Sequence, residues 1–591
     1  MAVHTKGEYC CDFETTSKAQ YLRDGYTKVY LFRMVDLKSG KKVDMGVNIE
    51  SFINSLKTNK DITKVYFHNL SFDGTFIIDH LLRVNYKWVE NEKFTEETKS
   101  STNNLFTSII DNFGSIYQLE IYFGENKKKV VINCSYKLTG LSIKDLGNLV
   151  SINKLNETHD YTEMKDYKTL EEVTEEEISY ITNDVEIMRQ GILKCYEMGI
   201  RGITKASACY KLWKNMSWQK WKNDIKTEYD ERTKQIVDDS YKGAITIMNP
   251  LYANKIIEGA IDYDVNSLYP SQMLYGEMPI GEYQTANTDE EINQSYNVRL
   301  YEIAVIEATI LKGYIPFIGV QKSLVFKESY EYKNTIKFMT LYLWDKEFEL
   351  FKTFYTGEWQ VTKVVAWKGE KNLFKEYIEK FKKIKEEAPN PSPERAFAKL
   401  CMNSVYGKFA QTTDRLSKAP FINDKDEVGF KVYKSECKTS YDRKIASRIT
   451  SLARCVLIEA IESNKDRFLY CDTDSIYLKG KEEAQNIPID DKKLGCWKME
   501  HTYSKFKGLK AKCYISTIDS GKEKGQLHSA VAGLPKDAQQ NLTYENFKNG
   551  LIIKDAKKRL YRVKGGIIID VCPFTIKIAN NEVLGGYQCN G

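Results

Sequence analysis

The stretch that most constrains this chain is residues 468–478, where two short apolar runs flank the polar centre Asp472-Thr473-Asp474. The β-prone runs predict a strand, a tight turn and a second strand. Two carboxylates one residue apart repel each other unless a cation lies between them. A hard divalent cation, which takes oxygen ligands from Asp and from phosphate, suits this position. An ordinary acidic turn is the competing interpretation, and further acids and cationic helices elsewhere in the chain must decide.

Composition limits the class of protein. The length of 591 residues allows roughly four domains of ~150 residues. The net charge of +6 is small for this length, so any partner must be recognised by local charge. No apolar run approaches the ~18 residues of a membrane span, and the N-terminus lacks a secretory h-region. Thirteen Cys without a CxxC pair and only six His argue against a zinc ribbon, so we expect an intracellular protein with no membrane partner.

Acidic residues recur on separate predicted elements near the N-terminus. Asp12 and Glu14 lie two apart in a β-prone stretch, so they project to the same face of a strand. Asp73 follows an apolar strand at 65–67 and a polar turn, where a helix begins. Acids on separate elements can converge on two metal ions ~3.5–4 Å apart, as phosphodiester hydrolysis requires. Taken singly, each acid also fits a surface strand or a turn.

A helix predicted near residues 175–184 carries the fourth acid. Thr174 is a suitable N-cap and Glu177 holds the capping-box position. Tyr180 and Asp184 are four apart and share one helix face. A solvated helix face is the alternative.

Together and in this order, these segments resemble the proofreading 3′–5′ exonucleases with a ribonuclease-H-like fold. The matching motifs are Asp12-Phe13-Glu14, Asn69-Leu70-Ser71-Phe72-Asp73 and Tyr180-x3-Asp184. The resemblance implies that Asp12, Glu14, Asp73 and Asp184 hold two metals and that Tyr180 orients the attacking water. It also implies that Asn69, Phe72, Ser135 and Tyr136 hold the single-stranded 3′ end, although a Leu usually follows that Ser. Lys154 is the nearest candidate for the catalytic Lys of such enzymes.

Asp264 supplies the carboxylate that the acidic turn needs. An apolar strand ends at Asp264, and a turn then starts a helix that contains Tyr269. A flat ring under a nucleotide sugar would clash with a 2′-hydroxyl and so select deoxyribose. A core aromatic is the alternative for Tyr269.

A cationic helix is predicted after residues 390–394. Ser392 is a suitable N-cap and Pro393 a suitable first helical residue. We expect one helix through Tyr406 that ends at Gly407. Arg395, Lys399, Asn403 and Tyr406 fall on one stripe. Such a stripe suits a triphosphate and a base, whereas a solvated basic face is the usual alternative.

These patterns resemble the sequence motifs of family B DNA polymerases. The matches are Asp264-x2-Ser267-Leu268-Tyr269-Pro270, Lys399-x3-Asn403-Ser404-x-Tyr406-Gly407 and Tyr470-Cys471-Asp472-Thr473-Asp474-Ser475. The resemblance implies catalysis by Asp264, Asp472 and Asp474, with Asp472 the firm metal ligand, Asp474 the less certain one and Val265 a further metal contact. It assigns the incoming nucleotide to Tyr269, Lys385, Arg395, Lys399, Asn403 and Tyr406. Shorter elements imply DNA contacts by Tyr241, Gly243, Arg454, Lys512 and Tyr514, although Ala244 replaces the second Gly of Tyr-x-Gly-Gly.

Size and insertions resemble the protein-primed bacteriophage polymerases of the phi twenty-nine type. We therefore expect an α/β and α+β multidomain chain, in which a ribonuclease-H-like exonuclease domain precedes a right-hand polymerase of palm, fingers and thumb with two palm insertions. The expected limits are exonuclease 1–200, first palm part with a polar linker 201–273, first insertion 274–367, fingers 368–410, second palm part 411–532 with the second insertion at about 414–436, and thumb with tail 533–591. The first insertion would contact the terminal protein, and the second would close a ring around DNA. Thumb phosphate contacts are expected from Lys554, Lys557, Lys558, Arg559 and Arg562, and the tail after Lys577 has no expected role.

The resemblance implies a phage replicative DNA polymerase with proofreading. It further implies two Mg²⁺ ions per active site (Mn²⁺ as a substitute) and dNTP substrates. The implied partners are primer-template DNA, a displaced single strand, a terminal protein and a single-stranded DNA-binding protein. A monomer in the cytoplasm of an infected bacterial host is expected. A reverse transcriptase or RNA polymerase is one alternative, but those enzymes place two Asp side by side, whereas Thr473 separates Asp472 from Asp474. Another alternative is a non-catalytic DNA-binding protein on a decayed polymerase scaffold. The presence of every expected metal carboxylate argues against such decay.

Overall fold

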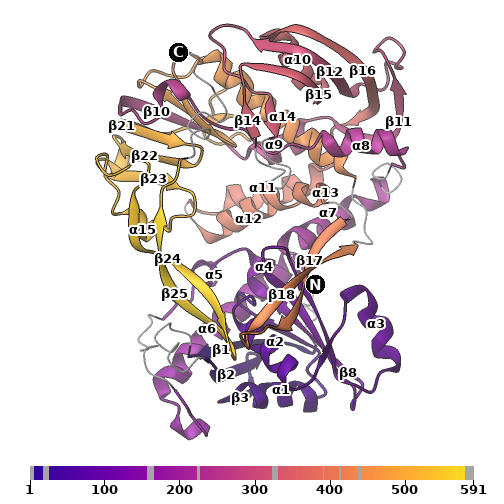
Figure 1. Cartoon of the computed structure of the whole chain (residues 1–591), viewed down its shortest axis with the longest axis vertical. Coiled ribbons are helices and arrows are strands. Elements are labelled where there is room, and N and C mark those ends of the chain that lie inside the picture. Colours follow the sequence, from indigo (N-terminus) through magenta and orange to yellow (C-terminus); the bar gives the residue numbers. More distant parts are fainter. Residues whose placement is uncertain are drawn as a thin grey trace.

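The chain forms two lobes joined by helices and by two long hairpins (Figure 1). The computed structural model describes residues 6–16, 26–155, 165–221, 227–321, 330–390, 392–411, 414–436 and 442–578. The tail from residue 579 onward lies outside the described residues. None of the described helices combines the length and the apolar character needed to cross a membrane.

A mixed eight-stranded sheet forms the N-terminal lobe. β4 is parallel to both β1 and β8, and β2 is antiparallel to β1. This arrangement confirms the predicted ribonuclease-H-like fold. The strand order is β3 (Lys42–Gly46), β2 (Val29–Asp36), β1 (Glu8–Thr15), β4 (Lys64–Phe67), β8 (Lys128–Cys134), β7 (Ile116–Phe123), β6 (Leu105–Ile110) and β5 (Lys87–Trp88). The helices are α1 (Ile49–Thr58), α2 (Asp73–Arg83), α3 (Asn91–Ser100), α4 (Ser135–Thr139), α5 (Ile143–Val150) and α6 (Glu175–Glu197).

An antiparallel seven-stranded sheet forms the centre of the other lobe. Its order is β23 (Leu527–Val531), β22 (Cys513–Ile518), β21 (Trp497–Lys510), β10 (Ile257–Val265), β20 (Ser475–Lys479), β19 (Phe468–Asp472) and β9 (Thr246–Met248). The predicted strand–turn–strand is confirmed, and Thr473 makes the turn at a φ of 59°. Because a β-branched residue rarely adopts a positive φ, this turn is tightly constrained. Helices α9 (Leu268–Tyr275) and α14 (Arg443–Ser463) pack against each other beside the sheet.

A second antiparallel sheet occupies the region of the predicted first insertion. Its strands are β11 (Met278–Ala286), β16 (Tyr355–Glu370), β12 (Val298–Ile310) and β15 (Thr335–Trp344), with the short pair β13 (Gly319–Gln321) and β14 (Tyr330–Tyr332) nearby. Helix α10 (Asp345–Phe354) packs against α14, which joins this sheet to the central one.

Two neighbouring helices form the predicted fingers, α11 (Lys375–Glu387) and α12 (Pro393–Ser404). The Ser392 hydroxyl caps α12 by accepting from the Arg395 backbone N–H at 3.2 Å, as predicted. The prediction of one helix up to Gly407 is wrong, because α12 ends at Ser404 and a short α13 (Tyr406–Phe409) follows. The Ser404 hydroxyl donates to the Leu400 carbonyl at 2.5 Å, a contact of the kind that bends helices.

The stretch predicted as a polar linker is largely helical, in α7 (Lys205–Trp221) and α8 (Glu231–Asp239). Cys209, Trp213 and Ser217 recur every four residues and form a buried stripe on α7. Because lysines surround them in the sequence, the stretch reads as polar. The Trp213 indole donates to the Leu373 carbonyl at 3.0 Å and lies 5.3 Å from the Phe374 ring. One hydrophobic core therefore runs from α6 of the N-terminal lobe through α7 into α11 and α12.

Two hairpins reach from the lobe of the seven-stranded sheet, which is the upper lobe in Figure 1, to the N-terminal lobe. The first, β17 (Asp414–Ile422) with β18 (Val428–Glu436), coincides with the predicted second insertion. The second, β24 (Ile552–Val563) with β25 (Gly566–Thr575), follows the short helix α15 (Lys536–Gln539) in the predicted thumb. On β24 the side chains of Lys554, Lys557, Lys558 and Arg559 are exposed, whereas Arg562 is partly buried.

Candidate active sites

Strand β1 and helices α2 and α6 bring the four N-terminal acids together. Glu14, Asp73 and Asp184 are only 5%, 3% and 8% exposed. Burial, and then the charge of Asp184, raises the pKa of Asp12 to about 8. Burial, and then the charge of Asp12, raises the pKa of both Glu14 and Asp73 well above the ordinary range. The four carboxyls thus feel one another's charge, as a shared cation site requires.

Lys154 and Tyr180 border this acidic cluster. The Lys154 Nζ lies 3.2 Å from Asp184 Oδ2 and 5.5 Å from the centre of the Tyr180 ring. The predicted capping box of Thr174 and Glu177 is present and fixes the start of α6, which carries both Tyr180 and Asp184. Lys154 therefore lies next to Asp184 and Tyr180, and its role as the catalytic lysine stays a prediction.

The residues expected to hold a single-stranded end are only partly exposed. Asn69, at a φ of 57°, makes the turn before Phe72, which precedes the first residue of α2. Tyr136 is 41% exposed, but Ser135 is fully buried and its hydroxyl bonds His68 Nδ1 at 2.9 Å. Ser135 therefore positions its neighbours and does not face solvent. His68, whose ring lies 5.7 Å from that of Tyr136, was missed, although it directly precedes the second exonuclease motif.

Three neighbouring strands bring the polymerase acids together. Asp264 on β10 and Asp472 on β19 both pair with Ser475 on β20, one from each side. The Val265 backbone N–H donates to the Asp474 carbonyl at 2.7 Å, which ties the turn to the end of β10. The predicted acids Asp264, Asp472 and Asp474 thus meet at the same end of three neighbouring interior strands of the sheet.

The two acids of the turn have different surroundings. Asp472 accepts from the Thr246 hydroxyl at 3.0 Å and from the Tyr470 hydroxyl at 3.3 Å. Burial, and then the charge of Asp474, raises the pKa of Asp264 to about 7. We expected Asp472 to be the firm partner of Asp264 and Asp474 the weaker one. The structure instead makes Asp474 the strongest charged neighbour of Asp264 and surrounds Asp472 with hydroxyl donors.

Lys399 and two tyrosines face these acids. The positive charge of Lys399 opposes the rise in pKa that burial imposes on Asp264 and Asp474. The rings of Tyr269 and Tyr406 stack, with centroids 4.6 Å apart and planes at 24°. A positive charge and a pair of stacked aromatic rings therefore both lie near the acids.

Other residues expected to contact the nucleotide brace the fingers. Lys385 is 7% exposed, and its Nζ donates to Asn266 Oδ1 at 2.7 Å. Burial, and then the charges of Arg395 and Lys399, lowers the pKa of Lys385 to about 8. Arg395 donates to the Lys385 carbonyl at 2.6 Å, and the Asn403 amide donates to the Lys399 carbonyl at 3.0 Å. The Arg395 contact joins α12 to α11, and the Lys385 contact joins α11 to the segment that follows β10, close to Asp264.

An open cleft of about 510 Å³ adjoins the acidic turn. It is lined by residues 472–475, Lys512, Tyr514 and residues 530–532. Lys512 is exposed, with its Nζ 3.6 Å from Asp472 Oδ1. Tyr514 is 7% exposed and its hydroxyl bonds that of Tyr477 at 2.7 Å, so it supports the wall of the cleft.

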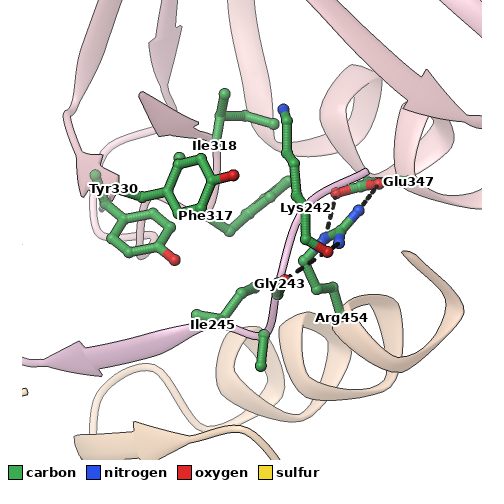
Figure 2. Close-up of a pocket in the computed structure, with 11 residues that line it drawn as sticks. Lys242, Gly243, Ile245, Phe317, Ile318, Tyr330, Glu347 and Arg454 are labelled. Atoms are coloured by element: carbon green, nitrogen blue, oxygen red, sulfur yellow. Dashed lines mark hydrogen bonds and ion pairs between the residues drawn. The ribbon is translucent and has the colours of Figure 1, made fainter. Parts of the chain in front are cut away.

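Arg454 does not occupy the surface position that we expected. It is 5% exposed and donates from Nε and Nη2 to the Glu347 carboxylate at 2.9 and 2.8 Å. Its Nη1 donates to the carbonyls of Lys242 and Gly243 at 2.7 and 3.3 Å (Figure 2). Arg454 therefore fixes the backbone of the segment that contains Lys242 and Gly243, and its expected direct contact with DNA stays a prediction. Glu347 was missed, because it lies 107 positions away from Arg454 in the chain.

Both acidic clusters have ligands suited to a hard divalent cation. Their donors are carboxylate oxygens, and the positive charges of Lys154 and Lys399 offset only part of the rise in the pKa values of Asp12 and Asp264. In the described part of the chain, no three His, Cys, Asp or Glu side chains already stand at the spacing of a closed metal site. The inference that a divalent cation suits these two clusters therefore rests on their carboxylate ligands and on the negative charge that the neighbouring lysines leave in part unbalanced.

The comparisons with known proteins point to one family. A family model described as DNA polymerase type B, organellar and viral, matches residues 55–492. The DNA polymerase of Bacillus phage phi29 is 30% identical over 591 aligned residues, with 96% of this chain and 99% of the phage protein covered. The chain belongs to the type B DNA polymerases of organelles and viruses. The predicted family is confirmed.

The similarity of this polymerase to its relatives extends over nearly its whole length. The DNA polymerase of Streptococcus phage Cp-1 is 28% identical, with 96% of this chain and 98% of that protein covered. The solved structure of phi29 DNA polymerase with primer-template DNA and incoming nucleotide superposes with a TM-score of 0.86 at 28% identity, over 97% of this chain and 100% of that one. The predicted exonuclease-plus-right-hand architecture is confirmed, and the chain is a DNA-directed DNA polymerase.

Proposed function

We propose that this polymerase copies a phage genome from a protein primer, displaces the non-template strand and proofreads with a 3′–5′ exonuclease. The observation that carries the proposal is the presence of two separate acidic clusters on two sheets. One lies beside Lys399 and the stacked tyrosines, and the other beside Lys154 and Tyr180. The similar phi29 structure was solved with primer-template DNA and incoming nucleotide.

For synthesis, Asp264 and Asp474 would hold two divalent cations with the help of the Val265 backbone, and Asp472 would brace them. Bound Mg²⁺ would acidify the primer hydroxyl and neutralise the triphosphate. Lys399, with Arg395 and Lys385 behind it, would offset charge on the leaving pyrophosphate. Tyr269 would carry the sugar and exclude a 2′-hydroxyl, with Tyr406 under the base.

For proofreading, Asp12, Glu14, Asp73 and Asp184 would hold the cations of a hydrolytic site. Tyr180 would orient the attacking water, with Lys154 beside it to neutralise developing charge. Asn69, Phe72 and Tyr136 would hold the frayed end, and His68 would fix Tyr136 through their ring contact. Burial of three of the four acids favours this role, because a dry site strengthens the attraction between carboxylate and cation.

The insertions and partners complete the proposal. The first insertion would contact the terminal protein, and the hairpin β17–β18 would enclose DNA and separate the strands. The displaced strand would pass to a single-stranded DNA-binding protein. The enzyme would act as a monomer in the cytoplasm of an infected bacterium.

Two assays on the purified chain test this function. With Mg²⁺ and dNTPs it should extend a DNA primer, and without dNTPs it should shorten a single-stranded oligonucleotide from its 3′ end. Transfer of a first deoxynucleotide to the hydroxyl of a candidate terminal protein tests protein priming. Extension of DNA primers without any such transfer would remove the priming part of the proposal, and absence of extension would remove the whole.

A further inference from the structure

The tips of the two long hairpins meet on helix α2 of the N-terminal lobe (Figure 1). From β17–β18, Val428 is 1% exposed and packs into the core of that lobe. From β24–β25, Ile567 is 4% exposed in the same core. Because the two hairpins leave the upper lobe at separate points, they and α2 complete a closed loop of structure.

A ring of charges joins the three elements where they meet. Asp426, at the tip of β17–β18, pairs with Arg83 of α2 at 2.7 Å and with Lys564, at the tip of β24–β25, at 2.8 Å. Arg83 also pairs with the buried Asp79 at 2.7 Å, and Asp79 accepts from the Gly565 backbone N–H at 3.2 Å. One carboxylate, that of Asp426, thus bonds cations from both other elements.

The backbone at this junction leaves little slack. Gly565 has a φ of +85°, and a side chain there would meet the Thr27 carbonyl oxygen at 2.1 Å. The Lys564 carbonyl accepts from the Thr27 backbone N–H at 2.9 Å, which fixes the thumb tip. Asp426 itself adopts a φ of 61°, which Asp tolerates better than most residues, and its side chain is 48% exposed. The thumb tip is therefore held to the N-terminal lobe by backbone contacts, whereas the hairpin β17–β18 reaches the thumb hairpin through side chains. Asp426 pairs with Lys564 at 2.8 Å, and the Arg562 guanidinium lies 4.2 Å from the centre of the Phe430 ring.

We propose that the ion pairs of Asp426 with Arg83 and Lys564 form an ionic clasp between the two hairpins and α2. Breaking these ion pairs opens the loop, so that a continuous DNA strand can enter or leave. Hydrogen bonds from Lys564 and then from Arg83 lower the pKa of Asp426 to about 2, so the clasp is charged at neutral pH. The contacts are partly exposed, so salt weakens them. The inference rests on the proposed function in one respect, namely that the loop encloses DNA.

Topology provides the test, because an enclosed strand with an end can slide out whereas a circle cannot. We would measure the half-life of the complex with a short primed single-stranded circle and with the same sequence cut open. The measurement uses Ca²⁺ without dNTPs, a phosphorothioate primer end, and excess competitor DNA. The wild-type half-life should be longer on the circle than on the cut template.

Asp426→Asn should shorten the half-life on the circle about three- to tenfold, the scale expected when two partly exposed ion pairs are lost. The half-life on the cut template should stay within about twofold, because phosphate contacts are untouched. Lys564→Gln should act in the same way from the thumb side. Asp424→Asn is the matched control, because Asp424 is exposed in the same turn and makes no ion pair with any described residue. High salt should remove the difference between the wild type and Asp426→Asn.

Other results would overturn the clasp. If Asp426→Asn shortened the half-life equally on the circle and on the cut template, Asp426 would contribute to general DNA affinity and not to closure of the loop. An unchanged half-life on the circle for both Asp426→Asn and Lys564→Gln would show that the loop opens elsewhere. Equal wild-type half-lives on the two templates would instead refute the enclosure of DNA in the proposed function, and the clasp with it.

Discussion

The two acidic clusters of this polymerase differ most in their access to solvent. Three of the four acids in the N-terminal cluster are at most 8% exposed, and the Lys154 Nζ lies 3.2 Å from Asp184 Oδ2. The acids of the central sheet are partly exposed beside a cleft of about 510 Å³, with Lys399 and Lys512 close by. A hydrolytic site needs to admit only a strand end and water, whereas a synthetic site must admit a duplex and a triphosphate. Burial therefore distinguishes the two chemistries better than the acids themselves do.

The largest expected effect separates the two centres completely. Asp264→Asn should lower the rate of primer extension about a thousandfold, or about 4 kcal/mol of transition-state stabilisation, because a metal ligand is lost. Degradation of single strands should be unchanged, since no element of the N-terminal cluster carries Asp264. Single-turnover rates of both reactions check this, and loss of both activities together would indicate misfolding.

The converse change tests the buried centre. The double variant Asp12→Ala with Asp184→Ala should slow 3′–5′ degradation about a thousandfold. It should leave correct extension within about twofold, because the acids of the central sheet keep their surroundings. The measurement is digestion of a labelled oligonucleotide, with extension of a matched primer as control. A variant that digests normally would contradict the assignment of this cluster.

A smaller contrast lies within the acidic turn. Asp474→Asn should reduce the extension rate about as much as Asp264→Asn, whereas Asp472→Asn should reduce it about tenfold, the scale expected for a group that supports metal ligands through hydrogen bonds. The reason is that Asp474 is the strongest charged neighbour of Asp264, while Asp472 bonds hydroxyl groups. Extension rates of both variants at saturating Mg²⁺ decide the question. The opposite order would restore Asp472 as the principal ligand.

The last expected effect is on stability as a function of pH and not on a reaction rate. In the folded chain the pKa of Asp12 is about 8 and that of Asp264 about 7, against an ordinary 3.8. Because the folded state holds these protons more tightly than the unfolded state, metal-free stability should fall as pH rises from about 4 to about 8 and then level off. Calorimetric Tm values with a chelator should show this slope, and Mg²⁺ should reduce it. A slope that Asp12→Asn leaves unchanged would exclude Asp12 as its source.

Local patterns predicted much of the fold and most acids of both sites. The turn at Thr473 and the capping box of Thr174 and Glu177 involve residues a few positions apart, so their chemistry is visible in the sequence. The buried pair of Arg454 and Glu347 joins distant segments, and nothing near either residue signals it. The roles of Asp472 and Asp474 depend on the rotation of the turn around Thr473, which spacing alone does not give.

Other misses have the same physical origin. The buried stripe of α7 is diluted by lysines, so composition suggested a linker where packing makes a helix. The break after Ser404 coincides with a hydroxyl that bonds back to the Leu400 carbonyl, a local contact that the helical spacing of the apolar residues does not reveal. Burial of Ser135 follows from its contact with His68, which comes from another strand end.

The continuous core from α6 through α7 to α11 and α12 restricts how such an enzyme can change over time. Helices α11 and α12 pack on apolar side chains that belong to the same core as the N-terminal lobe, and Trp213 of α7 contacts Leu373 and Phe374 in that core. Deleting the N-terminal lobe would expose this core to water and destabilise the nucleotide-binding helices. Exchange of single acids in this lobe would remove the proposed proofreading and leave the shared core intact, whereas loss of the whole lobe would remove part of the core on which the polymerase helices pack.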